Sequence, residues 1–140
     1  MDPTSRFHHC ALVVADLEAS LEWYQEKLDF RVESRFFLPE AQLDIAYLVS
    51  PGGFRLELIT RRQTSVEQPG DAPTADLITP GRMHICFEVK DVEAAAETLR
   101  QRKVTFVQQP KTIETAGVKN LWIADNEGNS IEFLEIIAPI

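Results

Sequence analysis

Apolar residues in the first half of the chain follow helical spacing once and strand-like spacing several times. Four of them recur on one face of a helix: Leu17, Leu21, Tyr24 and Leu28. Asp16, directly before them, is a favourable N-cap, so the pattern predicts a helix over residues 17–28. A short apolar run over residues 8–14 precedes this helix and predicts a strand. Three further strand-like runs follow the helix: residues 30–38, 43–50 and 54–60.

The second half of the chain shows the same order of elements. An apolar run over residues 83–89 comes first, and Asp91 then caps a predicted helix over residues 92–103. Three strand-like runs complete the half: residues 104–109, 117–125 and 129–137. Both halves therefore predict a βαβββ module.

The two halves also match residue by residue at a constant spacing. Setting "HHCALVVADLEAS" above "MHICFEVKDVEAA" aligns His9 with His84 and Asp16 with Asp91, each pair 75 positions apart. Further along, "GFRLELI" and "GNSIEFL" match at the same spacing and align Gly53 with Gly128 and Glu57 with Glu132. This repeat predicts a first module over residues 1–60 and a second over 81–140. The proline-containing segment 61–80 between them is predicted to be an extended linker.

Strand alternation places the repeated polar residues on one face of each predicted sheet. Side chains along a strand point alternately to opposite faces. Four alternate residues before the second helix are all apolar and should face that helix: Met83, Ile85, Phe87 and Val89. His84 then faces away from the helix, and by the repeat so does His9, which leaves His8 on the helix side. The same alternation turns Glu57 and Glu132 away from the helices.

These four polar side chains predict a metal site: His9, Glu57, His84 and Glu132. Imidazole nitrogen and carboxylate oxygen are suitable donors for a borderline divalent ion. Two carboxylates on one apolar face would repel each other without a cation. The alternative is four independent residues, hydrogen-bonded histidines and solvated glutamates, but that interpretation leaves their common spacing unexplained.

Composition narrows the class of protein further. The chain has 140 residues, 44% of them hydrophobic, and a net charge of -8, which fits one globular unit that binds neither nucleic acid nor an anionic membrane surface. It has no apolar run long enough to span a membrane, and its first residues do not resemble a signal peptide. We therefore expect a cytoplasmic protein, with Cys10 and Cys86 as buried free thiols.

Two stretches resemble a known family. "HHCALVVADLEASLEWYQEKLDF" resembles the opening strand and helix of the vicinal oxygen chelate superfamily, which includes glyoxalase I, and "DNEGNSIEFLE" resembles its closing strand. The resemblance implies an α+β fold in which two βαβββ modules form a cupped mixed sheet around one divalent metal ion (Ni, Co, Mn, Fe or Zn). In glyoxalase I the ligands are His, Glu, His and Glu, at the places held here by His9, Glu57, His84 and Glu132.

The resemblance implies a lyase or isomerase of the glyoxalase I kind. Such an enzyme abstracts a proton from a small chelating carbonyl substrate and forms a metal-stabilised enediolate. Glu132 is the first candidate for the base and Glu57 the second. Arg55, Arg61 and Lys119 are candidates for binding an anionic part of the substrate. Symmetric homodimers are the commonest soluble assembly, so we expect a homodimer. The site then forms either within one chain or across the two chains.

Glutathione is not expected as the co-substrate. Val13 and Arg61 stand where glutathione-dependent members carry Arg and Asn. Three other functions remain open alternatives. Acyl-coenzyme A epimerases of the superfamily carry Gln at the place of Glu57, and extradiol-type Fe(II) dioxygenases leave that place unligated. A metal-free binding or resistance protein is the third, although relatives of that kind generally lose the ligands.

Overall fold

The computed structural model describes residues 6–39, 41–62 and 83–138. The chain divides into two compact units, Met1–Gln68 and Pro69–Ile140, which are described separately below. The predicted linker over residues 61–80 begins at the last residue of a strand, and from residue 63 onward it lies outside the described residues.

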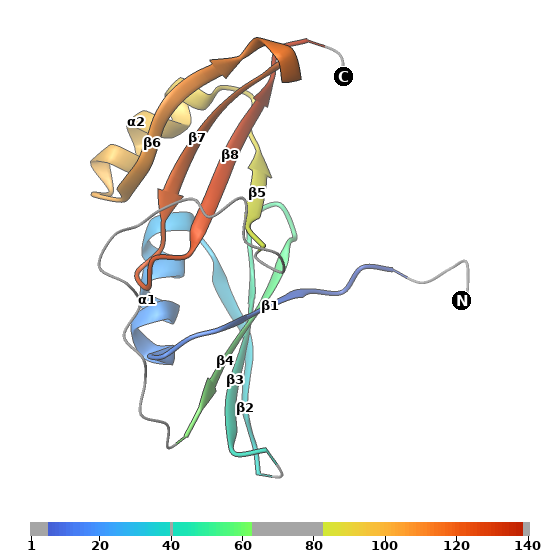
Figure 1. The fold of residues 1–140 in the computed structure, drawn as a ribbon. Coiled ribbons are helices and arrows are strands. Elements are labelled where there is room, and N and C mark those ends of the chain that lie inside the picture. Colours follow the sequence, from blue (N-terminus) through green and yellow to red (C-terminus); the bar gives the residue numbers. More distant parts are fainter. Residues whose placement is uncertain (1–5, 40, 63–82, 139–140) are drawn as a thin grey trace. The chain divides into compact units, whose positions relative to one another are not determined.

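The first unit is a four-stranded mixed sheet with one helix (Figure 1). Its elements are β1 (Cys10–Val13), α1 (Leu17–Leu28), β2 (Arg31–Leu38), β3 (Leu43–Val49) and β4 (Arg55–Arg61). The strand order is β1-β4-β3-β2, in which β1 runs parallel to β4 and the other neighbours are antiparallel.

The second unit repeats this topology. Its elements are β5 (Ile85–Glu88), α2 (Val92–Gln101), β6 (Thr105–Ile113), the short 3-10 helix η1 (Glu114–Ala116), β7 (Val118–Ala124) and β8 (Ser130–Ile136). The strand order is β5-β8-β7-β6, again with one parallel pair, β5 with β8. The predicted α+β class and the βαβββ modules are thus confirmed.

Both helices begin as the sequence predicts. The side chains of Asp16 and Asp91 each accept a hydrogen bond, at 3.0 Å, from the backbone N–H three residues further on. Helix α1 ends at Leu28, and Asp29 after it has a left-handed backbone with φ of 58°. After glycine, Asp and Asn are the residues that tolerate this conformation best, because their short polar side chains can form local hydrogen bonds.

Three elements of the second unit differ from the prediction by two residues or more, and the first of them, β5, begins at Ile85 rather than at Met83. Helix α2 ends at Gln101, because Lys103 adopts a left-handed backbone with φ of 57°. Strand β6 continues past Pro110 to Ile113. Proline is tolerated there because β6 is an edge strand and its pairing with β7 shifts register between Gln108 and Lys111.

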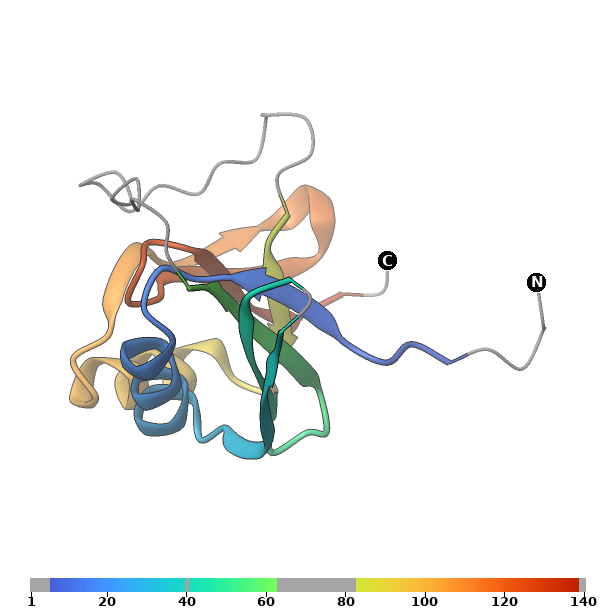
Figure 2. The same cartoon turned by 90° about the horizontal axis from the view of Figure 1, so that it is seen from below.

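Each helix packs against one face of its own sheet, as Figure 2 shows for α1. Six large strand residues are 0% exposed in these cores: Leu48, Leu56 and Leu58 in the first unit and Leu121, Ile123 and Ile131 in the second. The predicted helix-facing side of β4 and β8 is therefore confirmed. The opposite side of each sheet, called the open face below, carries the polar residues of interest. Among the described residues, no helix is long and apolar enough to cross a membrane.

Truncation of Leu58 is expected to destabilise the protein strongly. Its side chain is 0% exposed in the core between α1 and the sheet. Leu58→Ala should lower the free energy of unfolding by about 3 kcal/mol, because it removes buried methyl groups and leaves a cavity. Denaturant unfolding measures this change. Glu26→Ala, at an exposed position of α1, is the control and should shift stability by less than about 0.5 kcal/mol.

Candidate metal centre

In the first unit, the backbone brings His9 and Glu57 together on the open face. Strands β1 and β4 are parallel neighbours, with Ala11 opposite Glu57, and His9 lies one residue before β1. The distance from His9 Nε2 to Glu57 Oε2 is 3.0 Å. The carboxylate side chain is 12% exposed and the imidazole 29% exposed, so the pair is anchored in the sheet and still reachable from solvent.

The second unit contains the equivalent pair. Strands β5 and β8 are parallel, with Cys86 opposite Glu132, and His84 lies one residue before β5. The distance from His84 Nε2 to Glu132 Oε2 is 3.2 Å. The imidazole side chain is 36% exposed and the carboxylate side chain 13% exposed. The 75-residue repeat therefore extends from the sequence to the geometry of the side chains.

An aromatic ring stands beside each imidazole. Tyr47 pairs with Glu57 across β3 and β4, and Trp122 pairs with Glu132 across β7 and β8. The ring centroids are 5.3 Å apart for Tyr47 and His9, and 4.6 Å for Trp122 and His84, both in edge-on geometry. Each ring covers one side of the neighbouring imidazole with apolar surface.

The two carboxylates accept hydrogen bonds from different donors. The Tyr47 hydroxyl donates to Glu57. Burial, then this hydrogen bond, raises the pKa of Tyr47, so the phenol remains a donor at neutral pH. Glu132 Oε1 instead accepts from Asn120 Nδ2 at 2.8 Å. Neither donor is among the site residues predicted from the sequence, although strand alternation alone places Tyr47 on the face of Glu57 and Asn120 on the face of Trp122.

The residues just before the first strand of each unit depart from the prediction. His8 was expected on the helix side, but its Nδ1 lies 2.7 Å from Nδ1 of His9 and its ring lies 6.0 Å from that of Tyr47. Met83 was expected to face α2 and is 85% exposed. Both residues precede the strands, where alternation no longer determines the direction of a side chain.

The donor chemistry of each pair fits a divalent ion. Nitrogen and oxygen ligands that lie about 2.1 Å from one ion, at right angles, are about 3.0 Å apart. The two separations, 3.0 and 3.2 Å, match this spacing, which is also that of a direct hydrogen bond between imidazole and carboxylate. Within the described part of the chain, no three His, Cys, Asp or Glu side chains gather into a metal-binding group. Each unit thus contributes one pair, and a four-ligand site stays a prediction.

The three cations predicted to bind substrate have different surroundings. Arg55 forms two hydrogen bonds to Glu33, at 2.6 and 2.8 Å. Hydrogen bonding to Arg55 lowers the pKa of Glu33. Lys119 Nζ lies 2.6 Å from Oε1 of Glu93, which is in the first turn of α2. Lys119 is therefore on the helix side of its sheet. Arg61, at the exposed end of β4, shares the open face with Glu57.

Both cysteines are free thiols, but neither is buried as the sequence analysis expected. Cys10 is half-buried and Cys86 is exposed. Cys86 lies on the open face beside Glu132. Partial burial of its thiol, followed by the negative charge of Glu132, raises the pKa of Cys86 to about 12. Exposure at this position therefore does not make the thiol reactive.

Alkylation of Cys86 is expected to be slow in the metal-free protein. With a pKa of about 12, the thiolate fraction at pH 8 is on the order of one in ten thousand. A Cys10→Ser variant leaves Cys86 as the single thiol, and iodoacetamide should modify it roughly ten- to a hundredfold more slowly than a free cysteine, because the rarer thiolate is also the more nucleophilic one. Unfolding the same variant in denaturant supplies the fast reference rate. Equal rates in folded and unfolded protein would contradict the shift.

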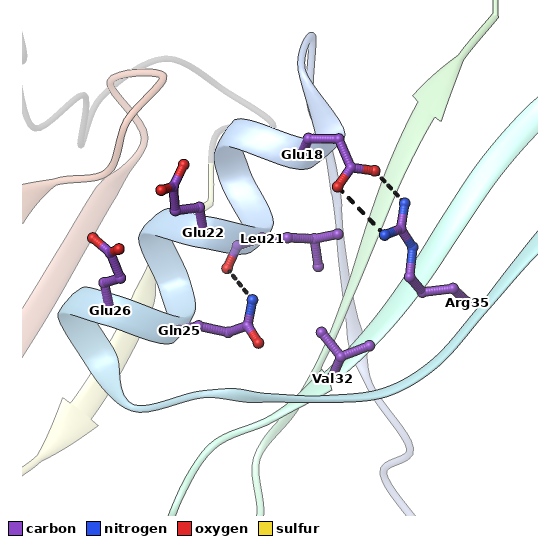
Figure 3. A pocket seen from close by; sticks show the side chains of 7 residues that line it. All are labelled: Glu18, Leu21, Glu22, Gln25, Glu26, Val32 and Arg35. Carbon is purple, nitrogen blue, oxygen red and sulfur yellow. Dashed lines mark hydrogen bonds and ion pairs between the residues drawn. The ribbon is translucent and has the colours of Figure 1, made fainter.

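A separate hollow of about 500 Å³ lies between α1 and β2 on the helix side of the first sheet (Figure 3). Its lining consists of Glu18, Leu21, Glu22, Gln25, Glu26, Val32 and Arg35. Glu18 and Arg35 form an ion pair at one edge. None of the predicted ligands lines this hollow, so it is distinct from the open-face site.

Comparisons with known proteins agree with this fold. The family model of the glyoxalase/bleomycin resistance protein/dioxygenase superfamily matches residues 6–133. Mitochondrial methylmalonyl-CoA epimerase of Homo sapiens is 28% identical over 116 residues, which are 80% of this chain and 62% of the epimerase. The uncharacterized protein YwbC of Bacillus subtilis is 22% identical and covers 93% of this chain and 97% of its own length.

Solved structures show the same fold at low sequence identity. A glyoxalase family protein from Enterococcus faecalis has a TM-score of 0.75 at 23% identity, with 94% of this chain and 98% of that chain covered. The trypanothione-dependent glyoxalase I of Leishmania major has a TM-score of 0.67 at 22% identity, with 94% and 87% covered. At these identities the likeness concerns the fold alone.

Proposed function

Since the chain belongs to the glyoxalase/bleomycin resistance protein/dioxygenase superfamily, we propose that it is a divalent-metal-dependent lyase or isomerase of the glyoxalase I kind. Four side chains hold the ion in this proposal: His9, Glu57, His84 and Glu132. They come together within one chain or across a homodimer. The substrate is a small carbonyl compound with two adjacent oxygens, and the reaction begins with removal of a proton from the carbon next to the carbonyl.

One observation carries the proposal. Each unit holds a histidine and a glutamate on its open face with 3.0 or 3.2 Å between Nε2 and Oε2. A surface histidine or glutamate is commonplace, but two such pairs with the same spacing, burial and strand pairing are not explained by chance placement. Their donor set suits Ni, Co, Mn, Fe or Zn.

A bound divalent ion supplies Lewis acidity, which stabilises negative charge on a substrate oxygen. The protein residues accept the proton and exclude water from the site. Glu132 would hold the ion through Oε2, the oxygen that lies toward His84, while Oε1 is held by Asn120; once released from the ion, Oε2 accepts the proton. Trp122 is 5% exposed and excludes water from one side of His84. Glu57 is the second candidate for the base.

Arg61 is the cation best placed to bind an anionic group of the substrate. It shares the open face with Glu57 and lies four residues along β4. An anion at Arg55 would have to displace Glu33, and Lys119 lies on the helix side with Glu93. We therefore assign substrate binding first to Arg61.

An acyl-coenzyme A epimerase is the second candidate function. The observation in its favour is the 26–28% identity to the mitochondrial methylmalonyl-CoA epimerases of Homo sapiens, Bos taurus and Mus musculus. This chain spans about three fifths of the length of those relatives. Against it stands Glu57, where the sequence analysis expects Gln in an epimerase. Both functions start with the same proton abstraction.

Exchange of substrate hydrogen with solvent deuterium tests the shared step and separates the two functions. The full chain, loaded with Ni²⁺ or Co²⁺, is incubated in D₂O with methylmalonyl-CoA or with a panel of α-hydroxy carbonyl compounds, and exchange is followed by ¹H NMR. We expect exchange with a member of the panel and little with methylmalonyl-CoA. The reverse result would favour the epimerase. Absence of exchange with every compound would contradict proton abstraction.

A further inference from the structure

The two carboxylates of the candidate site are supported differently, although the repeat makes their surroundings equivalent. Asn120 corresponds to Ile45 in the first unit, because both pair with the residue two positions after the glutamate of their own unit. Ile45 offers no hydrogen bond. Glu132 therefore has an amide donor at a place where Glu57 has only apolar surface.

We infer that Asn120 is a positioning residue that fixes Glu132 as a one-oxygen metal ligand. The inference rests on the proposed function, since it concerns the same site. Its basis is the hydrogen bond of 2.8 Å from Asn120 Nδ2 to Glu132 Oε1, which leaves Oε2 toward His84 at 3.2 Å. The hydrogen bond on Oε1 holds the carboxylate in this orientation, in which Oε2 is the oxygen presented to the ion.

The orientation of the Asn120 amide is itself determined by a neighbour. Gln108 Nε2 donates to Asn120 Oδ1 at 3.0 Å. Turning the Asn120 amide over would place two N–H groups against each other and would point its oxygen at the Glu132 carboxylate. Asn120 is 4% exposed, so water cannot readily replace either hydrogen bond. Nδ2 is therefore held toward Glu132.

The result is a continuous row of polar side chains across the second sheet. Gln108 lies on the edge strand β6, Asn120 on β7, and Glu132 on β8, while His84 precedes β5 on the other edge. Each member contacts the next at 2.8 to 3.2 Å. In such a row, the outer residues restrict the rotamer of the glutamate without touching the ion or the substrate.

Cobalt binding by the full chain tests this role with two readouts other than activity. Asn120→Leu removes the donor, and Gln108→Leu removes the group that orients it. Ile123→Val is the matched control, because Ile123 lies in the same strand, is 0% exposed and faces α2. For each protein, the Co²⁺ dissociation constant and the visible absorption spectrum of the bound Co²⁺ are measured, and circular dichroism verifies folding.

We expect Asn120→Leu to weaken Co²⁺ binding by about ten- to a hundredfold and to alter the visible spectrum, because the ligand oxygen loses its fixed position. Gln108→Leu should show a smaller change in the same direction, and it carries the test if Asn120→Leu does not fold. Ile123→Val should match wild type. If wild type binds Co²⁺ and both polar variants match Ile123→Val, the inference is overturned and the proposed function stands. If wild type binds no Co²⁺, both are overturned.

Discussion

Replacing His84 with alanine is expected to abolish tight binding of a divalent metal ion. His84 is one of only two nitrogen donors in the proposed set, and its Nε2 lies 3.2 Å from the carboxylate of Glu132. Loss of a direct ligand should weaken binding by more than the roughly ten- to hundredfold change caused by residues behind the ligands. Isothermal titration of the metal-free protein with Co²⁺ measures the change.

His8→Ala is the informative comparison for this experiment. His8 contacts His9 Nδ1 at 2.7 Å and is not among the proposed ligands. Its removal should leave one ion bound per chain, with affinity reduced by at most about a hundredfold. If His84→Ala binds Co²⁺ as tightly as wild type, the proposed ligand set is wrong. If His8→Ala abolishes binding, the first unit uses a different histidine from the one that the repeat indicates.

Replacing Glu132 with glutamine is expected to lower the rate of substrate proton exchange by about a hundredfold to ten-thousandfold. The amide keeps the size of the carboxylate and an oxygen donor, but it cannot accept a proton at neutral pH. Exchange with D₂O is followed by NMR on protein saturated with metal, so that a change in affinity does not lower the rate. Glu57→Gln is the matched variant in the first unit.

We expect Glu57→Gln to retain most of the exchange rate, because Glu132 is the first candidate for the base. The opposite pattern, with exchange lost in Glu57→Gln and kept in Glu132→Gln, would reverse the two roles while leaving the metal site intact. If both variants exchange the substrate proton at the wild-type rate, neither glutamate is the base.

The repeat made the two histidine–glutamate pairs predictable because the fold obeys simple alternation within each strand. Leu56 and Leu58 pack toward α1, so Glu57 between them has to face the other way. The parallel pairing of β1 with β4 then brings His9 beside Glu57, and the same applies to His84 and Glu132. Local patterns therefore determine the face of each glutamate, and the pairing of distant strands brings the histidine to it.

Other features depended on contacts that alternation does not encode. Arg55 is bound by Glu33, which lies where the pairing of β2 with β3 shifts register between Val32 and Ser34. Such a bulge changes which residues share a face, and the sequence of β2 does not reveal it. The bond from Asn120 to Glu132 likewise depends on a side-chain rotamer that Gln108 fixes from a third strand.

In the proposed function, the two histidine–glutamate pairs, one from each unit, bind one ion. Metal analysis of the 140-residue chain by inductively coupled plasma mass spectrometry tests this, first after purification without chelators and again after soaking with Co²⁺ and removal of excess ion. We predict one divalent ion per chain in the wild type and none in His84→Ala. If the wild type retains no ion after soaking, the four residues do not form a metal site.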